Sequence, residues 1–182
     1  MTTVLDLYAR ISDDFTALLV GCPPDRWEEP SPCPGWTAWD VAAHVIGNHR
    51  RALAGLDGSD YESPSRGEDL LAAWHSASGE VKAALLDPSR AATMLGDDFG
   101  NMPFAAFVNR MACADTLIHT WDFARATRQN ERLDAEAVQL ATEMLAPEDS
   151  DIRLPNAYGP KVAAANSADD QTRLLNFLGR NP

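Results

Sequence analysis

Basic residues are scarce in this 182-residue chain. Fifteen lysines and arginines stand against 27 aspartates and glutamates, which gives a formal net charge of −12. A field of that sign repels nucleic-acid phosphates and anionic membrane surfaces. The few basic clusters, such as Arg50-Arg51, are isolated and fit the solvated face of a helix. We therefore expect neither a nucleic-acid partner nor a membrane partner.

Cysteine is scarce as well. Cys22, Cys33 and Cys113 are odd in number and show no CxxC spacing, which argues against a disulfide framework and against a structural zinc knuckle. No apolar run approaches the roughly 20 residues that cross a bilayer, and the acidic first residues lack the pattern of a signal peptide. We expect a cytoplasmic protein with reduced thiols, in which Cys113 is a core residue on a helix.

Several common catalytic motifs are also missing. The sequence contains no Gly-rich phosphate loop, no nucleophile elbow and no HExxH, which removes nucleotide hydrolysis, α/β-hydrolase and metalloprotease chemistry from consideration. Its composition, with 45% hydrophobic and 23% charged residues, is that of an ordinary globular protein. Length and composition together predict one folded domain over residues 1–182.

Helical spacing is the main signal that is present. Apolar residues recur at three- and four-residue steps over residues 3–20, which predicts a first amphipathic helix. A loop rich in Pro and Trp follows, and then Thr37 with Asp40 three residues on resembles a capping box. The second helix should start there and run to about Leu56, where Gly55 and Gly58 stop it.

The second half of the chain predicts further helices. Ser65-Arg66-Gly67-Glu68 resembles another capping box and predicts a third helix that ends at Pro88. Residues 91–101 could be extended or a crossover loop. Pro103 is well placed as the first residue of a long, buried fourth helix that runs to Arg128. Beyond it we expect a helix over Ala135–Leu145, capped by Asp134, and a short terminal helix over Ala168–Leu178.

These elements predict an all-α fold. Four long helices with one long crossover form a four-helix bundle, and the terminal helix is an addition to it. The interior of such a bundle is a usual place for a metal site that is built from side chains on facing helices.

Asp115 and His119 are the first candidates for such a site. They are four residues apart on the predicted fourth helix, about 40° apart on one face, and can converge on one ion. Catalytic zinc sites typically use three protein ligands and leave a fourth position open. His44 is the best third ligand, because an unpaired imidazole would be awkward among the apolar residues around it.

A plainer interpretation stays open. A histidine among apolar residues is often a hydrogen-bonded core residue, and an Asp–His pair at this spacing can be a surface interaction. Asp122, three residues after His119, could accept a hydrogen bond behind a ligand or could be one more solvated acid. Cys33 is a weaker candidate nucleophile, because nothing in the sequence places a base beside it.

The other histidines and the tryptophans have structural interpretations. His49 lies about 140° around the helix from His44 and should not share its site, and His75 is expected at the surface. Asp40 is already explained as a capping residue. The tryptophans are expected to be core or loop anchors, some of which could line a pocket: Trp27, Trp36, Trp39, Trp74 and Trp121.

Two segments carry a resemblance to a known family. The stretch Pro32-Cys33-Pro34-Gly35-Trp36-Thr37 with Asp40-Val41-Ala42-Ala43-His44, and the stretch from Asp115 to Asp122, resemble the metal-binding motifs of the DinB-like superfamily. Within it, the chain is most similar to the N-terminal domain of mycothiol-dependent maleylpyruvate isomerase. Its end, from Leu154-Pro155 to Phe177-Leu178-Gly179-Arg180, resembles a related uncharacterised single-domain group.

The resemblance implies a function. It implies a four-helix bundle with a catalytic-type metal centre, zinc first and nickel as the alternative, on which His44, Asp115 and His119 map one by one. The isomerase branch has Glu where this chain has Asp115, which is one methylene shorter. The family also implies mycothiol or a similar small thiol, which the metal presents to a small electrophilic substrate in a transfer or isomerisation reaction.

Two other matters stay open at this stage. A non-catalytic metal-binding protein, acting in metal handling or regulation, is the alternative to the enzyme. The chain could also form a homodimer.

Overall fold

The computed structural model describes residues 3–153 and 158–182, with the backbone alone at Cys113 and Asp151. Leu154-Pro155, at the start of the C-terminal segment noted above, lies outside this range. The chain divides into two compact units, Met1–Glu131 and Arg132–Pro182. One folded domain over the whole length stays a prediction, and each unit is described by itself.

The first two helices begin at capping boxes. In α1 (Val4–Gly21), Thr3 is the N-cap, and its side chain and backbone exchange hydrogen bonds with Asp6. In α2 (Ala38–Asp57), Thr37 and Asp40 do the same, as the sequence predicts. Gly58 ends α2 in the left-handed conformation, with φ of 66°.

The second helix ends one residue past the predicted Leu56, whereas the predicted start of the third helix was wrong. Gly55 does not interrupt α2 but lies inside it, with Phe99 packed where a side chain would stand. The segment Ser65–Glu68 forms a turn in which the Glu68 N–H donates to the Ser65 carbonyl. The third helix, α3 (Leu70–Leu86), starts instead after Asp69, whose carboxylate accepts hydrogen bonds from the N–H groups of Leu71 and Ala72.

The stretch between α3 and the predicted fourth helix is a crossover. It contains the short helix α4 (Pro88–Ala91) and the single turn η1 (Asp97–Phe99). Met94 and Pro103 form an isolated bridge, and Pro103 stands just before the next helix rather than at its first residue. Apart from this bridge and a second one between Pro30 and Thr37, the described residues hold no β-structure.

The predicted fourth helix is continuous but not regular. It consists of α5 (Phe104–Met111), the π-helical turn η2 (Ala112–Thr116) and α6 (Leu117–Thr127). A π turn holds one residue more than an α turn would, and such turns often occur at functional sites. Asp115 lies within this turn.

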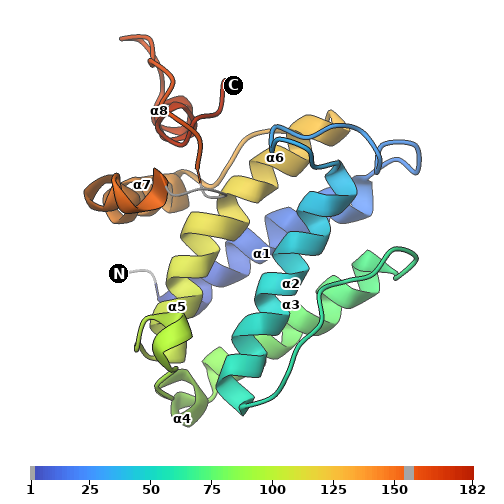
Figure 1. Cartoon of the computed structure of the whole chain (residues 1–182), viewed down its shortest axis with the longest axis vertical. Coiled ribbons are helices and arrows are strands. Elements are labelled where there is room, and N and C mark those ends of the chain that lie inside the picture. The colour runs from blue at the N-terminus through green and yellow to red at the C-terminus, as the bar shows by residue number, and fades with distance from the viewer. Residues whose placement is uncertain (1–2, 154–157) are drawn as a thin grey trace. The chain divides into compact units, whose positions relative to one another are not determined.

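The first unit is a four-helix bundle. α1 packs against α3 and the α5–α6 run, and α2 packs against α3 and α6 (Figure 1). Aromatic side chains pack edge to face in the core. The ring centres of Phe15 and Trp74 are 4.9 Å apart, and those of Phe15 and Phe123 are 5.8 Å apart. This core holds α2 and α6 side by side, which positions the site described below.

The described residues of the second unit form two α-helices. α7 (Ala135–Leu145) has the predicted bounds and the predicted cap, Asp134. The single turns η3 (Ala146–Glu148) and η4 (Asp151–Arg153) follow, and α8 (Asp170–Phe177) is two residues shorter at its start and one at its end than predicted. Among all the described helices, none is both long and apolar enough to cross a membrane.

Candidate metal centre

The three residues that the sequence proposed as ligands lie together. His44 comes from α2, Asp115 from the π turn and His119 from the first turn of α6. Asp115 Oδ1 is 2.9 Å from His44 Nε2 and 3.6 Å from His119 Nε2. One ligand atom from each residue lies within 4.8 Å of the other two, which is close enough for all three to bind a single cation.

The cluster lies at the edge of the core. The side chains of His44, Asp115 and His119 are 33%, 22% and 11% exposed, so solvent reaches them mainly at His44. Burial works against the charge on Asp115, but the positive charge of His119 and the hydrogen bond and charge of His44 outweigh it and lower the pKa of Asp115 to about 2. Burial likewise disfavours a charged His44, yet Asp115 raises the pKa of that imidazole.

One polar atom of the cluster has no protein partner. Asp115 Oδ2 is buried and makes no hydrogen bond within the described structure. A buried carboxylate oxygen without a partner is costly, and a bound cation would remove that cost. Two imidazole nitrogens and a carboxylate are also the donor set that zinc accepts, so the residues present fit a divalent metal ion.

Behind His119 lies a buried carboxylate. Asp122 is completely buried, and its Oδ2 is 3.0 Å from His119 Nδ1. The same oxygen accepts a hydrogen bond from the Cys33 thiol at 3.3 Å. Asp122 is therefore not a solvated acid, and the structure places a carboxylate beside Cys33 that no sequence pattern had indicated.

A tryptophan stacks beside the two histidines. The Trp36 ring centre is 4.9 Å from that of His44 and 5.8 Å from that of His119. The tight turn before it depends on Gly35, whose φ of 80° is strained for other residues, and on the hydrogen bond from the Trp36 N–H to the Cys33 carbonyl. The Pro-Cys-Pro-Gly-Trp loop thus brings both Cys33 and Trp36 to the cluster.

The remaining sequence candidates lie elsewhere. His49 is fully buried and is not one of the grouped ligand residues, and its Nδ1 donates to the Val45 carbonyl. His75 is exposed, as expected, and Asp40 caps α2. Trp74 and Trp121 are core residues. The side chain of Cys113 lies outside the described residues, although its backbone is helical as expected.

Sequence reasoning missed Asn48. It follows His44 by one helical turn, and its Nδ2 is 3.0 Å from His44 Nε2. The only available signal was the four-residue spacing, which places both side chains on one face of α2.

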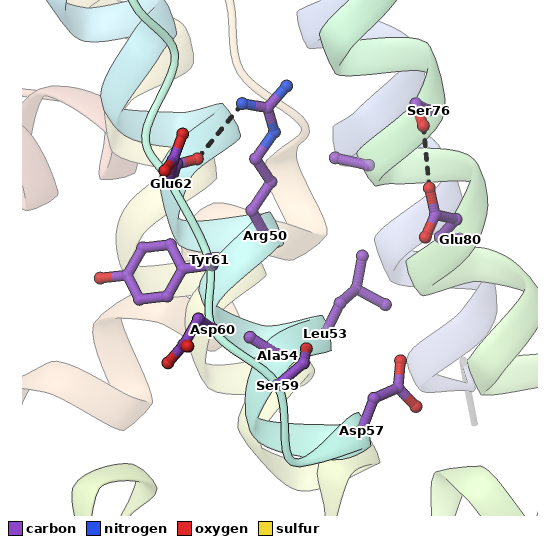
Figure 2. A pocket seen from close by; sticks show the side chains of 11 residues that line it. Arg50, Leu53, Ala54, Asp57, Ser59, Asp60, Tyr61, Glu62, Ser76 and Glu80 are labelled. Carbon is purple, nitrogen blue, oxygen red and sulfur yellow. Dashed lines mark hydrogen bonds between the residues drawn. The ribbon is translucent and has the colours of Figure 1, made fainter.

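A separate hollow lies farther along α2. It has a volume of about 250 Å³, and its wall includes Arg50, Tyr61 and Glu80 but none of the three cluster residues. Figure 2 shows Arg50 pointing to Glu62, and Ser76 hydrogen-bonded to Glu80, which lies four residues later on α3. Arg50 donates to the Glu62 carbonyl and Ser76 donates to the Glu80 carboxylate. Because its wall contains none of His44, Asp115 and His119, the hollow is distinct from the cluster of these three residues.

Comparison with known proteins identifies a family for the chain. Residues 8–124 match the family model of the mycothiol maleylpyruvate isomerase N-terminal domain. An uncharacterized protein of Mycobacterium tuberculosis is 32% identical over 139 residues, which cover 76% of this chain and 74% of that protein. A second uncharacterized protein of that organism is 43% identical over 53 residues, which cover 29% of this chain and 20% of the relative. No solved structure matches the chain significantly.

The family match includes His44, Asp115 and His119, and it covers well over half of the chain. The all-helical bundle is consistent with the DinB-like superfamily to which the sequence motifs pointed. The chain belongs to the family of the mycothiol maleylpyruvate isomerase N-terminal domain.

Proposed function

We propose that this protein binds one divalent metal ion, zinc in the first place and nickel as the alternative, through His44, Asp115 and His119. The observation that carries the proposal is the convergence of these three side chains, with ligand atoms within 4.8 Å and one carboxylate oxygen left without a partner. We further propose that the bound ion serves a thiol-using transferase or isomerase whose substrate is a small electrophile.

The residues around the cluster have defined tasks in this proposal. Asp122 accepts the Nδ1–H of His119, which fixes the neutral tautomer whose Nε2 lone pair faces Asp115. Charged His119 and His44 lower the pKa of the Asp115 carboxyl, and a bound cation would replace them in keeping that carboxylate ionised. His44 must give up the proton that it shares with Asp115 before it can act as a ligand.

A thiol is the expected co-substrate. A bound cation lowers the pKa of a thiol, so that the nucleophilic thiolate exists at neutral pH. The family's name refers to mycothiol, and three protein ligands leave a coordination position for an exogenous sulfur. Trp36 would cover one side of that sulfur, since its ring lies against both histidines.

The metal is tested by elemental analysis of tag-free protein. Wild type should contain close to one equivalent, and His44→Ala and His119→Ala should lose most of it. His75→Ala is the matched control, because His75 is an exposed histidine on another helix and should retain the metal. Full metal content in both ligand variants would remove the proposed centre.

The thiol is tested separately with cobalt in place of the native metal. Addition of N-acetylcysteine, a small monothiol, should produce a sulfur-to-cobalt charge-transfer absorption in wild type. An unchanged spectrum at millimolar thiol, in protein that holds cobalt, would leave a metal-binding protein without thiol chemistry.

A further inference from the structure

Asn48 occupies a particular place on α2. Among residues 41–49 only His44 and Asn48 keep access to solvent, and every other side chain in that stretch is buried. The two lie one helical turn apart on the same face. Asn48 therefore borders the cluster on the partly exposed face of α2.

The contacts of this amide depend on the state of His44. Its nitrogen carries two hydrogens and lies 3.0 Å from His44 Nε2. His44 Nε2 has one hydrogen-bonding site in the ring plane, yet Asp115 Oδ1 is within 2.9 Å of it as well. The imidazole cannot fully satisfy both neighbours. Once a cation takes the Nε2 lone pair, Nε2 cannot accept from Asn48, and an Asn48 N–H is available to a ligand that binds beside the ion.

We propose that Asn48 is the hydrogen-bond donor for the exogenous anion that binds next to His44, Asp115 and His119. The ligand class is a small anion with a soft or hard donor atom, either a thiolate sulfur or an anionic oxygen or nitrogen. This inference rests on the metal centre proposed above and names a positioning residue for the same site. Asn48 would hold the anion toward α2 and stabilise its negative charge.

A neutral amide suits this task better than a charged side chain. A lysine or arginine beside Asp115 would pair with that carboxylate and compete with the metal ion for it. A carboxylate at position 48 would repel an incoming anion. The amide donates a hydrogen bond without either effect.

The test uses cobalt-loaded full-length protein and inorganic azide as the probe, with dissociation constants obtained from the visible spectrum. Asn48→Ala should keep one equivalent of cobalt but bind azide about tenfold more weakly, the effect of one lost charge-assisted hydrogen bond. Asn48→Asp has nearly the same shape but an added charge. It should hold cobalt at least as tightly as wild type and bind azide more weakly than Asn48→Ala.

The control is Gln139→Ala, which truncates an exposed helical amide that bonds Glu143 one turn along α7. This variant should bind cobalt and azide with the same dissociation constants as wild type. Azide affinity that is equal in Asn48→Ala and wild type would overturn the role of Asn48 while leaving the metal centre intact. If Asn48→Ala lost as much cobalt as His44→Ala, the amide would be a metal ligand. That result would also overturn the role of Asn48 as a donor to the anion. Wild type that holds no cobalt, or holds cobalt without binding azide, would overturn the inference together with the open metal centre.

Discussion

At the scale of single residues, Asp122 should control metal affinity without touching the metal. Its carboxylate accepts the Nδ1–H of His119 and so orients the ring, and Asp122→Asn keeps the shape but removes the charge. We expect metal affinity to fall about 10- to 100-fold, measured by competition with a chelator of known affinity. The stoichiometry should stay at one metal ion when the metal is in excess.

Cys33→Ser provides the comparison for that experiment. A serine hydroxyl can still donate to Asp122, so metal affinity should stay close to that of wild type. The structure also groups Cys33, His119 and Asp122 closely enough to hold an ion. If Cys33→Ser lost the metal and Asp115→Asn retained it, the ion would be bound by Cys33, His119 and Asp122. That result would contradict the proposal that His44 and Asp115 are ligands.

His49 predicts an acid-sensitive fold. Burial lowers the pKa of its imidazole from the ordinary 6.5 to about 4. Between these values the unfolded chain binds a proton that the folded protein does not, so the free energy of unfolding should fall as the pH drops, by up to about 1.4 kcal/mol per pH unit. Urea titrations of wild type and His49→Gln from pH 7 to 4 should show a shallower pH dependence in the variant. Equal slopes would mean that His49 does not contribute.

At the scale of helices, two glycines should respond in opposite ways to alanine. Gly79 is exposed in α3 with nothing near its absent side chain, so Gly79→Ala should stabilise the protein by roughly 0.5–1 kcal/mol. A Cβ on Gly55 in α2 would lie 2.4 Å from the Phe99 ring. Gly55→Ala should therefore destabilise by about 1–3 kcal/mol, less a small gain in helix propensity.

Thermal melts of the two glycine variants measure this difference. Phe99 also packs on Phe107 and beneath Arg51, so its displacement should disturb the crossover rather than the ends of α2. If Gly55→Ala stabilised the protein as Gly79→Ala does, the Phe99 ring would have to move aside freely.

Most helix boundaries were predictable because their signals are local. Thr37 with Asp40, and Asp134, satisfy N–H groups within three residues of themselves, so the sequence around them suffices. The start of α3 was misplaced because Ser65–Glu68 and Asp69 offer competing caps close together. Arg50 and the Ser65 N–H both engage the Glu68 side chain in the turn, and the contact with Arg50 is not visible in a local pattern.

The site was predictable only in part, for the same reason. His44, Asp115 and His119 could be proposed from helical spacing and family resemblance. The π turn at Asp115, the Cys33–Asp122 contact and the place of Asn48 depend on which segments pack together. Cys33 and Asp122 are 89 residues apart in the chain, and no periodicity links them.

At the scale of the whole molecule, the proposed metal would join distant parts of the chain. His44 and Asp115 are 71 residues apart, and an ion that binds both binds the folded state alone. At a free concentration 100 times its dissociation constant, such an ion raises the free energy of unfolding by about 2.7 kcal/mol. Chelation should therefore lower the melting temperature by roughly 5–10 °C.

The variant His44→Ala tests the source of that shift. Its melting temperature should be the same with and without chelator, because the ion would have lost a ligand from α2. A shift of wild-type size in this variant would show that the metal stabilises some other part of the molecule.

The loop that places Trp36 against His44 and His119 has an optical consequence. An indole in contact with an imidazole loses fluorescence when that ring is protonated, and a paramagnetic ion within a few ångströms quenches it more strongly. Cobalt uptake should therefore dim the intrinsic emission of the protein, and Trp36→Phe should remove most of the change although the other tryptophans remain. The protein would then report its own metal occupancy in real time, without a dye, and the rate of metal entry could be read directly from a stopped-flow trace.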